Sequence, residues 1–248
     1  DDGRLTLHEL HRFANTLHPL PDGLHWNTLG LWANLTEGLA KAVVHCRDQN
    51  LDLTALGVDT WGVDFGLIGA SGGLVGLPYA YRDPRNQAAM DKTIAMLGAE
   101  RLYGVTGIQF MPFNTIFQLV ALHDHDPGLL EQAKHLLFMP DLLHYLFTGE
   151  ISCEYSIAST SQLLDARSAD WARDIVGELG LPSGMLGRIS PSGHTVGTLR
   201  PEVADATGAD PSLRVITPAG HDTGSAVVSV PTEGGEDWCY LSSGTWSL

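Results

Sequence analysis

The alternation of hydrophobic and polar residues predicts extended strands in the first third of the chain. Leu5–Phe13 alternates in this way, and Thr60–Ile68 does so more clearly, with glycine or aspartate between large apolar residues. The apolar side of this second segment comprises Trp61, Val63, Phe65 and Leu67. Ser71-Gly72-Gly73 is a turn sequence, so Leu74–Tyr81 is expected to return as the second strand of a hairpin.

Helical periodicity dominates the middle of the chain. The first helix carries apolar residues at three- and four-residue steps, namely Trp32, Leu35, Leu39, Ala42 and Val43. Asp83-Pro84 is typical of a helix start, and residues 86–147 are predicted to be largely helical, with breaks at Met111-Pro112 and Asp126-Pro127-Gly128. Gly149 is placed to cap the last of these helices.

The last third of the chain mixes both kinds of element. A helix is expected at Ser168–Leu179, and residues 182–212, rich in Gly, Pro and Ser, are expected to be irregular. Leu213–Ile216 and Trp238–Leu241 are predicted to be short strands, each leading into a turn sequence. Strands that alternate with helices in this way indicate the α/β class.

Composition narrows the function classes. The 248 residues are 44% hydrophobic, enough for a packed core, and the formal net charge of −15 argues against nucleic-acid binding, which needs a basic surface. No apolar run reaches the ~18 residues of a membrane-spanning helix. The cysteines at 46, 153 and 239 are far apart, so we expect free thiols, a cytoplasmic protein and no metal site.

Two turns after predicted strands carry candidate chemistry. In Gly220-His221-Asp222-Thr223-Gly224 the glycines permit a tight turn that leaves Asp222 free to accept a proton, although an N-cap for a helix at Ser225–Ser229 explains it equally well. Ser242-Ser243-Gly244-Thr245 combines hydroxyls with a permissive backbone, as in phosphate-binding turns and in ordinary turns. The chain has no Walker A loop, so phosphates would be held by such turns.

Taken together and in order, the motifs of this chain resemble the FGGY family of carbohydrate kinases over nearly the whole length. No single motif decides the resemblance, which rests on their order and spacing. They are Gly57-Val58-Asp59-Thr60-Trp61-Gly62-Val63-Asp64, Pro78-Tyr79-Ala80-Tyr81-Arg82-Asp83, Phe113-Asn114-Thr115, Met139-Pro140-Asp141-Leu142-Leu143, Ala158-Ser159, Gly220-His221-Asp222-Thr223 and Ser243-Gly244-Thr245. The resemblance implies an actin-like ATPase fold with a ribonuclease H-like domain, in which helices flank a mixed sheet.

The resemblance also implies roles for individual residues. The family's catalytic base falls on Asp222, and sugar contacts fall on Gly62, His221 and Thr223, where the missing side chain at position 62 lets a sugar approach the backbone. Contacts to ATP fall on Ser243, Gly244 and Thr245. Trp61 is either a core residue or a platform that stacks on the sugar, and the pattern leaves both open.

The implied activity is ATP- and Mg²⁺-dependent phosphorylation of a ketose at its terminal C1 hydroxyl. L-rhamnulose is the expected ketose, and xylulose, fuculose or a non-catalytic sugar-binding module on the same fold are alternatives. Members of the family open with an Asp-x-Gly phosphate loop and carry a second, nucleotide-binding domain, neither of which is found in this sequence. Residues 1–241 are therefore expected to be most of the N-terminal domain of a longer chain, and residues 242–248 the start of the connection to the second.

Overall fold

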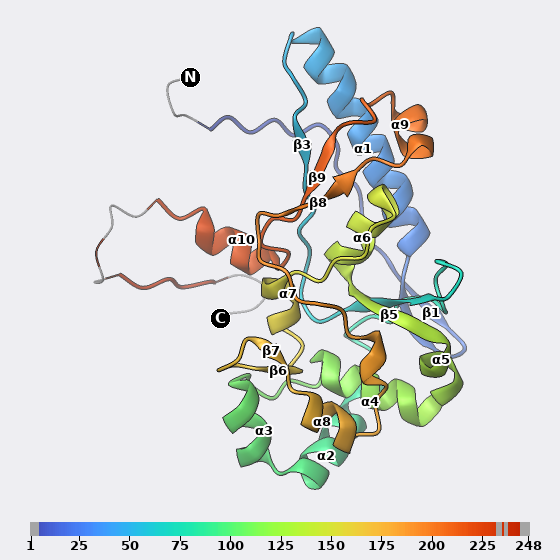
Figure 1. Ribbon diagram of the computed structural model, residues 1–248, viewed down its shortest axis with the longest axis vertical. Helices are drawn as coiled ribbons and strands as arrows, with labels where there is room; N and C mark the ends of the chain where they lie inside the picture. The colour runs from blue at the N-terminus through green and yellow to red at the C-terminus, as the bar shows by residue number, and fades with distance from the viewer. Residues whose placement is uncertain (1–4, 232–234, 236–237, 244–248) are drawn as a thin grey trace.

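The computed structural model describes residues 5–231, 235 and 238–243 (Figure 1). Ten α-helices are described there: α1 (Thr28–Asp48), α2 (Arg85–Leu97), α3 (Ala99–Thr106), α4 (Thr115–His125), α5 (Pro127–Gln132), α6 (Met139–Thr148), α7 (Tyr155–Ser159), α8 (Arg173–Glu178), α9 (Pro201–Thr207) and α10 (Asp222–Val228). Nine strands are described: β1 (Leu17–Leu20), β2 (Gly23–Trp26), β3 (Ala55–Leu56), β4 (Phe65–Gly69), β5 (Ala133–Phe138), β6 (Leu164–Asp165), β7 (Asp170–Trp171), β8 (Thr195–Thr198) and β9 (Arg214–Ile216). A 3₁₀ turn, η1, covers Ser183–Met185.

The strands form four small sheets rather than one wide one. The three-stranded sheet has the order β3-β9-β8. Strand β9 is parallel to β3 and antiparallel to β8. The pairs β1-β2, β4-β5 and β6-β7 are antiparallel. In Figure 1 helices α1 and α9 lie beside the three-stranded sheet at the top, while α2, α3, α4 and α8 cluster at the bottom. This is the α/β arrangement of sheets flanked by helices that the sequence predicted.

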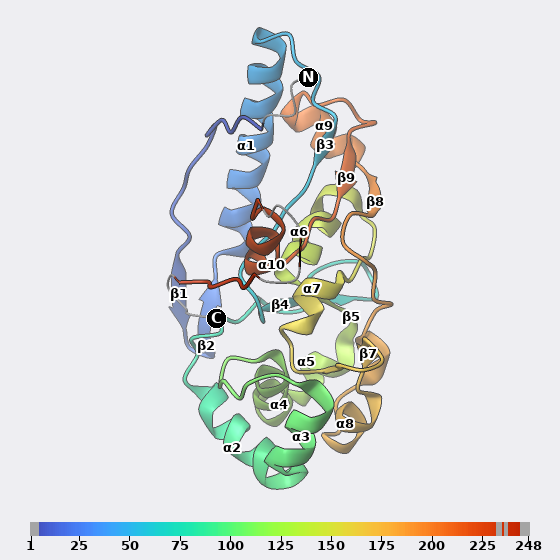
Figure 2. The ribbon, with the colours of Figure 1, turned by 90° about the vertical axis from the view of Figure 1, so that its left-hand side faces the viewer.

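The lower hydrophobic core is built around α4. Residues 115–122 of this helix are all buried, because α2 packs on one side and the β4-β5 pair and α8 enclose the rest. A second core joins α1, α6, α9 and β9 around Phe147 and Val215, which are fully buried. Figure 2 shows α1 along one side of the molecule, reaching from this upper core down toward β2. A third, smaller cluster lies on the other face of the β4-β5 pair and consists of Leu31, Ile68, Leu137, Met139 and Leu142.

Several predicted helical features are confirmed. Helix α1 covers the periodic apolar face, and its N-cap Asn27 accepts a hydrogen bond from the Gly30 N–H. Helix α2 begins one residue later than predicted, with Pro84 rather than Asp83 at its N-cap, although the Asp83 carboxylate still accepts from the Arg85 N–H. The predicted breaks separate α3 from α4 and α4 from α5, and Gly149 ends α6 in the left-handed conformation with φ 80°.

Other predicted elements were wrong. Residues 5–16 form no strand, and the described residues 238–241 form none either, because neither segment finds a ladder partner. Residues 133–138 are strand β5 instead of helix, since they pair with β4 in the interior. The helix expected at Ser168–Leu179 is only α8, after the short strand β7, and the region expected to be irregular contains η1, β8 and α9.

Candidate functional site

Two segments run side by side into the site from the parallel pair β3-β9. Beyond these strands the backbone continues to pair: the Thr60 N–H donates to Gly220 O at 3.0 Å, and the Asp222 N–H donates to Thr60 O at 2.8 Å. The carboxyl ends of parallel strands meet at one edge of a sheet, which is where open α/β folds place their ligand sites. The arrangement therefore brings Trp61 and Gly62 next to His221 and Asp222, which are about 160 residues further along the chain.

Asp222 is the first residue of α10. Its Oδ1 accepts from the Thr223 N–H at 2.6 Å, and its side chain is 56% exposed. The N-cap position belongs to His221, so the alternative role of Asp222 as the N-cap of a later helix is not what the structure contains. A carboxylate at the start of a helix is stabilised by the free N–H groups there, and this one still faces solvent. It is thus available to accept a proton.

His221 lies between that carboxylate and Gly62. Its Nε2 is 3.5 Å from Asp222 Oδ1, and burial lowers the pKa of the imidazole, although the charge of Asp222 partly opposes this. The ring is consequently neutral near pH 7 and can donate or accept a hydrogen bond to a polyol without adding charge.

Gly62 is closely packed at the base of the site. A Cβ at this position would lie 3.1 Å from Thr160 Cγ2 and 3.3 Å from His221 Nε2. Both contacts are tight, so a side chain at position 62 would require Thr160 and His221 to shift by a few tenths of an ångström. The next residue, Val63, has φ 68°, and its N–H donates to Thr160 Oγ1 while its carbonyl accepts from Thr115 Oγ1. This left-handed residue breaks the alternation expected from Thr60 onward, and strand β4 begins only at Phe65.

Trp61 lies against Trp26 on one wall of the site. The two rings are 4.3 Å apart, and both indole N–H groups donate to Asp64 Oδ2. Asp64 is fully buried and also accepts from Gln118 Nε2 and the Tyr81 N–H. Burial raises the pKa of Asp64 to about 6 despite these four donors. Trp61 is half-buried, packs against the core and also lines the cleft, so its core role is confirmed and its stacking on a sugar stays a prediction.

Many of the residues described so far line a cleft of about 640 Å³. Trp61, Gly62, His221, Asp222 and Thr223 all border it. The remaining lining residues are Val63, Tyr81, Ile108, Gln109, Met111, Phe113, Asn114, Thr160, Ala226 and Ser242. A cleft of this size accommodates a small ligand such as a monosaccharide.

The loop between α3 and α4 forms the wall that sequence reasoning missed. Gln109, Met111 and Phe113 line the cleft from this loop. Asn114 Nδ2 donates to Gln109 O and to Gln162 Oε1, each at 2.8 Å, and Gln162 Nε2 donates to Ile108 O at 3.0 Å. These buried amides fix the loop. The Phe113-Asn114-Thr115 motif marks this loop in the sequence. Nothing in the sequence indicates that Asn114 pairs with Gln162, 48 residues further along.

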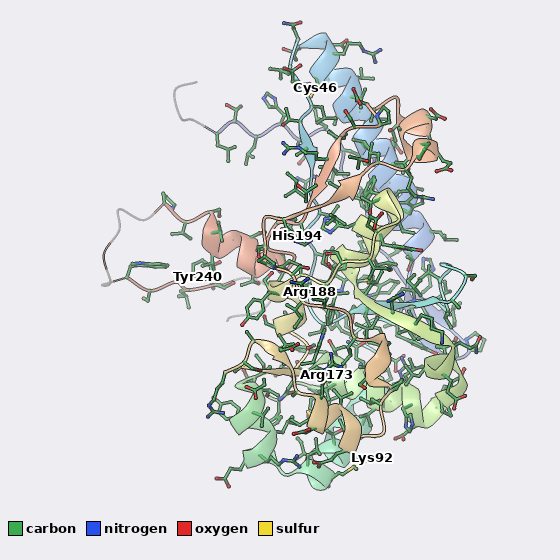
Figure 3. The ribbon with its side chains drawn as sticks, viewed as in Figure 1. Cys46, Lys92, Arg173, Arg188, His194 and Tyr240 are labelled. Atoms are coloured by element: carbon green, nitrogen blue, oxygen red, sulfur yellow. The ribbon has the colours of Figure 1, made fainter. Side chains whose placement is uncertain are left out.

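The predicted nucleotide contacts are only partly within the described residues. Ser242 lines the cleft and Ser243 is exposed, whereas Gly244 and Thr245 lie outside the described residues. Figure 3 labels Tyr240 on the arm that precedes them, which extends beside α10 away from the body of the molecule. Among the residues that the structure describes, no three His, Cys, Asp or Glu side chains are grouped as a metal site, and no helix is long and apolar enough to cross a membrane.

The chain belongs to the FGGY family of carbohydrate kinases, since the model of the family's N-terminal domain matches residues 5–229. It is similar to the rhamnulokinases of Bacteroides thetaiotaomicron (42% identical over 247 residues) and Oceanobacillus iheyensis (41% over 247 residues). Each comparison covers 100% of this chain but only 50% and 51% of the relative. The chain therefore spans about half the length of the curated relatives it matches.

Solved structures of sugar kinases share the fold. A carbohydrate kinase from Novosphingobium aromaticivorans superposes with a TM-score of 0.74 at 22% identity, covering 87% of this chain and 44% of that one. A xylulose kinase from Rhodospirillum rubrum gives 0.72 at 19% identity, covering 82% and 42%. These neighbours confirm the actin-like ATPase fold implied by the resemblance.

Proposed function

We propose that this chain is the sugar-binding half of an ATP-dependent ketose kinase, and that L-rhamnulose is its ketose. The observation that carries the proposal is an exposed carboxylate, Asp222, on the wall of a monosaccharide-sized cleft in a carbohydrate kinase domain. The choice of sugar is supported by relatives named rhamnulokinase that match the whole chain at about 40% identity. Xylulose and fuculose are the alternative sugars, because sugar choice depends on a few hydrogen bonds.

In the proposed reaction Asp222 accepts the proton of the C1 hydroxyl while that oxygen attacks the γ-phosphorus of ATP. The new bond joins the sugar oxygen to phosphorus, and the bond from phosphorus to the bridging oxygen of ADP breaks. His221, Thr223 and Gly62 hold the sugar, and Trp61 supplies an aromatic wall beside it. Positioning of the hydroxyl next to a base in a cleft that excludes water provides most of the rate enhancement.

ATP and Mg²⁺ are the proposed cosubstrate and cofactor. Mg²⁺ on a nucleotide needs only one or two protein carboxylates, because phosphate oxygens and waters supply its other ligands. When bound, the metal would neutralise charge on the transferred phosphate. Ser243, Gly244 and Thr245 are the proposed contacts to ATP, with Thr245 at the γ-phosphate. They lie in the proposed connection, residues 242–248, to a nucleotide-binding domain.

Asp222→Asn in the full-length protein tests the proposal. It keeps the shape of the side chain but removes the proton acceptor, so turnover with L-rhamnulose and ATP should fall by roughly 10²–10⁴-fold, with a smaller change in sugar binding. Asp205→Asn, on the exposed side of α9, is the matched control. Near-normal turnover of Asp222→Asn would refute the assignment of the base. A full-length protein that turns over no ketose in a panel containing xylulose and fuculose would favour a sugar-binding module.

A further inference from the structure

The turn that carries Asp222 lies on a buried carboxylate, Glu154, that the reaction itself does not use. Glu154 is at the N-cap of α7 and has no exposed surface. Its Oε2 accepts from the Gly220 N–H at 2.9 Å, the Ile157 N–H at 3.0 Å and Ser156 Oγ at 2.6 Å. Its Oε1 accepts from the Ser156 N–H at 2.8 Å and from Ser192 Oγ at 2.5 Å. Both oxygens are thus fully hydrogen-bonded.

The backbone of Glu154 is itself held in place. Its N–H donates to the carboxyl of Asp141, and it pairs with Ser190 in a parallel bridge. Figure 3 labels Arg188 and His194, which bound the segment that passes beside α7 and contains Ser190. We call Glu154 and its hydrogen bonds the clamp. The clamp joins α6, α7 and this segment.

Glu154 is ionised, whereas burial opposes ionisation of its neighbour Asp141. Burial opposes ionisation of Glu154, but hydrogen bonds from Ser156, Ser192 and Gly220 outweigh it and hold the pKa below the ordinary value. Burial and the charge of Glu154 raise the pKa of Asp141 well above its ordinary value. A buried charge that receives five hydrogen bonds holds its partners more firmly than a neutral acceptor would.

The hydrogen bonds of Glu154 reach the base through two short paths. Gly220, whose N–H it binds, is two residues before Asp222, and a Cβ there would lie 3.0 Å from Glu154 Oε2. Ser156, whose hydroxyl it orients, accepts the His221 N–H at 3.2 Å. The amides of Gly220 and His221 are thereby fixed, and they lead directly into the first turn of α10.

We propose that Glu154 is a positioning residue for the phosphoryl transfer, acting through the Gly220–Asp222 turn to aim the carboxylate of Asp222 at the sugar hydroxyl. The inference rests on the proposed function, in which Asp222 is the base. A displacement of about 1 Å in a catalytic group costs on the order of 10²-fold in rate, so loss of the clamp should lower turnover rather than ground-state binding.

The test is a double-mutant cycle in the full-length protein, with Glu154→Gln, Asp222→Asn and the double variant. Glu154→Gln replaces one accepting oxygen with a donor while keeping the volume. We expect kcat with L-rhamnulose to fall roughly 10–100-fold, while KM for ketose and ATP each change less than about threefold. The double variant should be no slower than Asp222→Asn, because a residue that acts only through the base has no effect once the base is gone.

Two further variants control for structure. Glu178→Gln makes the same chemical change on the surface of α8, where the carboxylate pairs with Arg101, and should leave kcat unchanged. Glu154→Asp keeps the charge and should recover part of the lost turnover. If circular dichroism shows that Glu154→Gln does not fold, Glu154→Asp takes its place in the double-mutant cycle.

The outcomes separate this inference from the function it rests on. If Asp222→Asn is inactive while Glu154→Gln keeps normal kcat, the positioning role is wrong and the base assignment stands. The positioning role is also wrong, and the base assignment also stands, if Glu154→Gln lowers the kcat of Asp222→Asn by the same factor by which it lowers the kcat of the wild type. If Asp222→Asn is itself near normal, the base assignment fails and the positioning role fails with it.

Discussion

The burial of Asp64 behind the cleft wall can be tested through the pH dependence of stability. Its carboxyl is fully buried beneath Trp26 and Trp61, and burial raises its pKa from 3.8 to about 6. A carboxyl whose pKa is higher in the folded state binds its proton more tightly there. Its contribution to stability is therefore present in full below about pH 4 and is lost as the pH rises through about 6.

The magnitude follows from this shift. At 1.36 kcal/mol per pH unit, the full effect is about 3 kcal/mol, of which about 1.4 kcal/mol is lost between about pH 5 and pH 7.5. Asp64→Asn removes the titration. The free energy of unfolding of the wild type, minus that of the variant, should therefore decrease by about 1.4 kcal/mol over this range. Urea denaturation at several pH values measures it, and because Trp26 and Trp61 donate to Asp64, tryptophan fluorescence should report the same transition.

Glu178→Gln is the control of opposite sign. Hydrogen bonds from Arg101 hold the pKa of Glu178 below its ordinary value of 4.5, so the corresponding difference should increase with pH only below about 4.5 and stay flat between about pH 5 and 7.5, and the increase is small because both side chains are exposed. A flat difference for Asp64→Asn would refute the burial argument. A difference that increases with pH would mean that the four hydrogen-bond donors outweigh burial and lower the pKa of Asp64.

Three further predictions concern the site, the core and the isolated chain. Gly62→Ala should raise KM for the ketose roughly tenfold, with KM for ATP unchanged, because its Cβ displaces His221 and Thr160; equal effects on both would indicate a disturbed strand. Phe117→Ala, in the lower core, should lower the free energy of unfolding by about 3–5 kcal/mol in urea titrations; a loss under about 1 kcal/mol would contradict its burial. Residues 1–248 alone should phosphorylate no ketose in a coupled ADP assay, because one wall of the cleft cannot enclose ATP; robust turnover by the pure chain would contradict the proposed domain division.

Local sequence determined the helices and their ends. The 3.6-residue periodicity of α1, the prolines at the breaks and the glycine after α6 act within a few residues, so they can be read without knowledge of the fold. Motif order likewise identified the family and the exposed acid at 222. These features depend on short-range backbone preferences and on residue types that stand next to one another in the chain.

Only tertiary structure decided the strands and the support of the site. Strand β5 reads as helix in sequence, because its last three residues, 136–138, are buried on both faces of the β4-β5 pair and show no alternation. Val63 takes a left-handed conformation because Thr160 and Thr115, far away in sequence, bond its amide and carbonyl. The clamp of Glu154 on Gly220 spans 66 residues. A buried polar residue looks the same in sequence whether its partner exists or not, because its energy depends on groups that only the folded chain brings together.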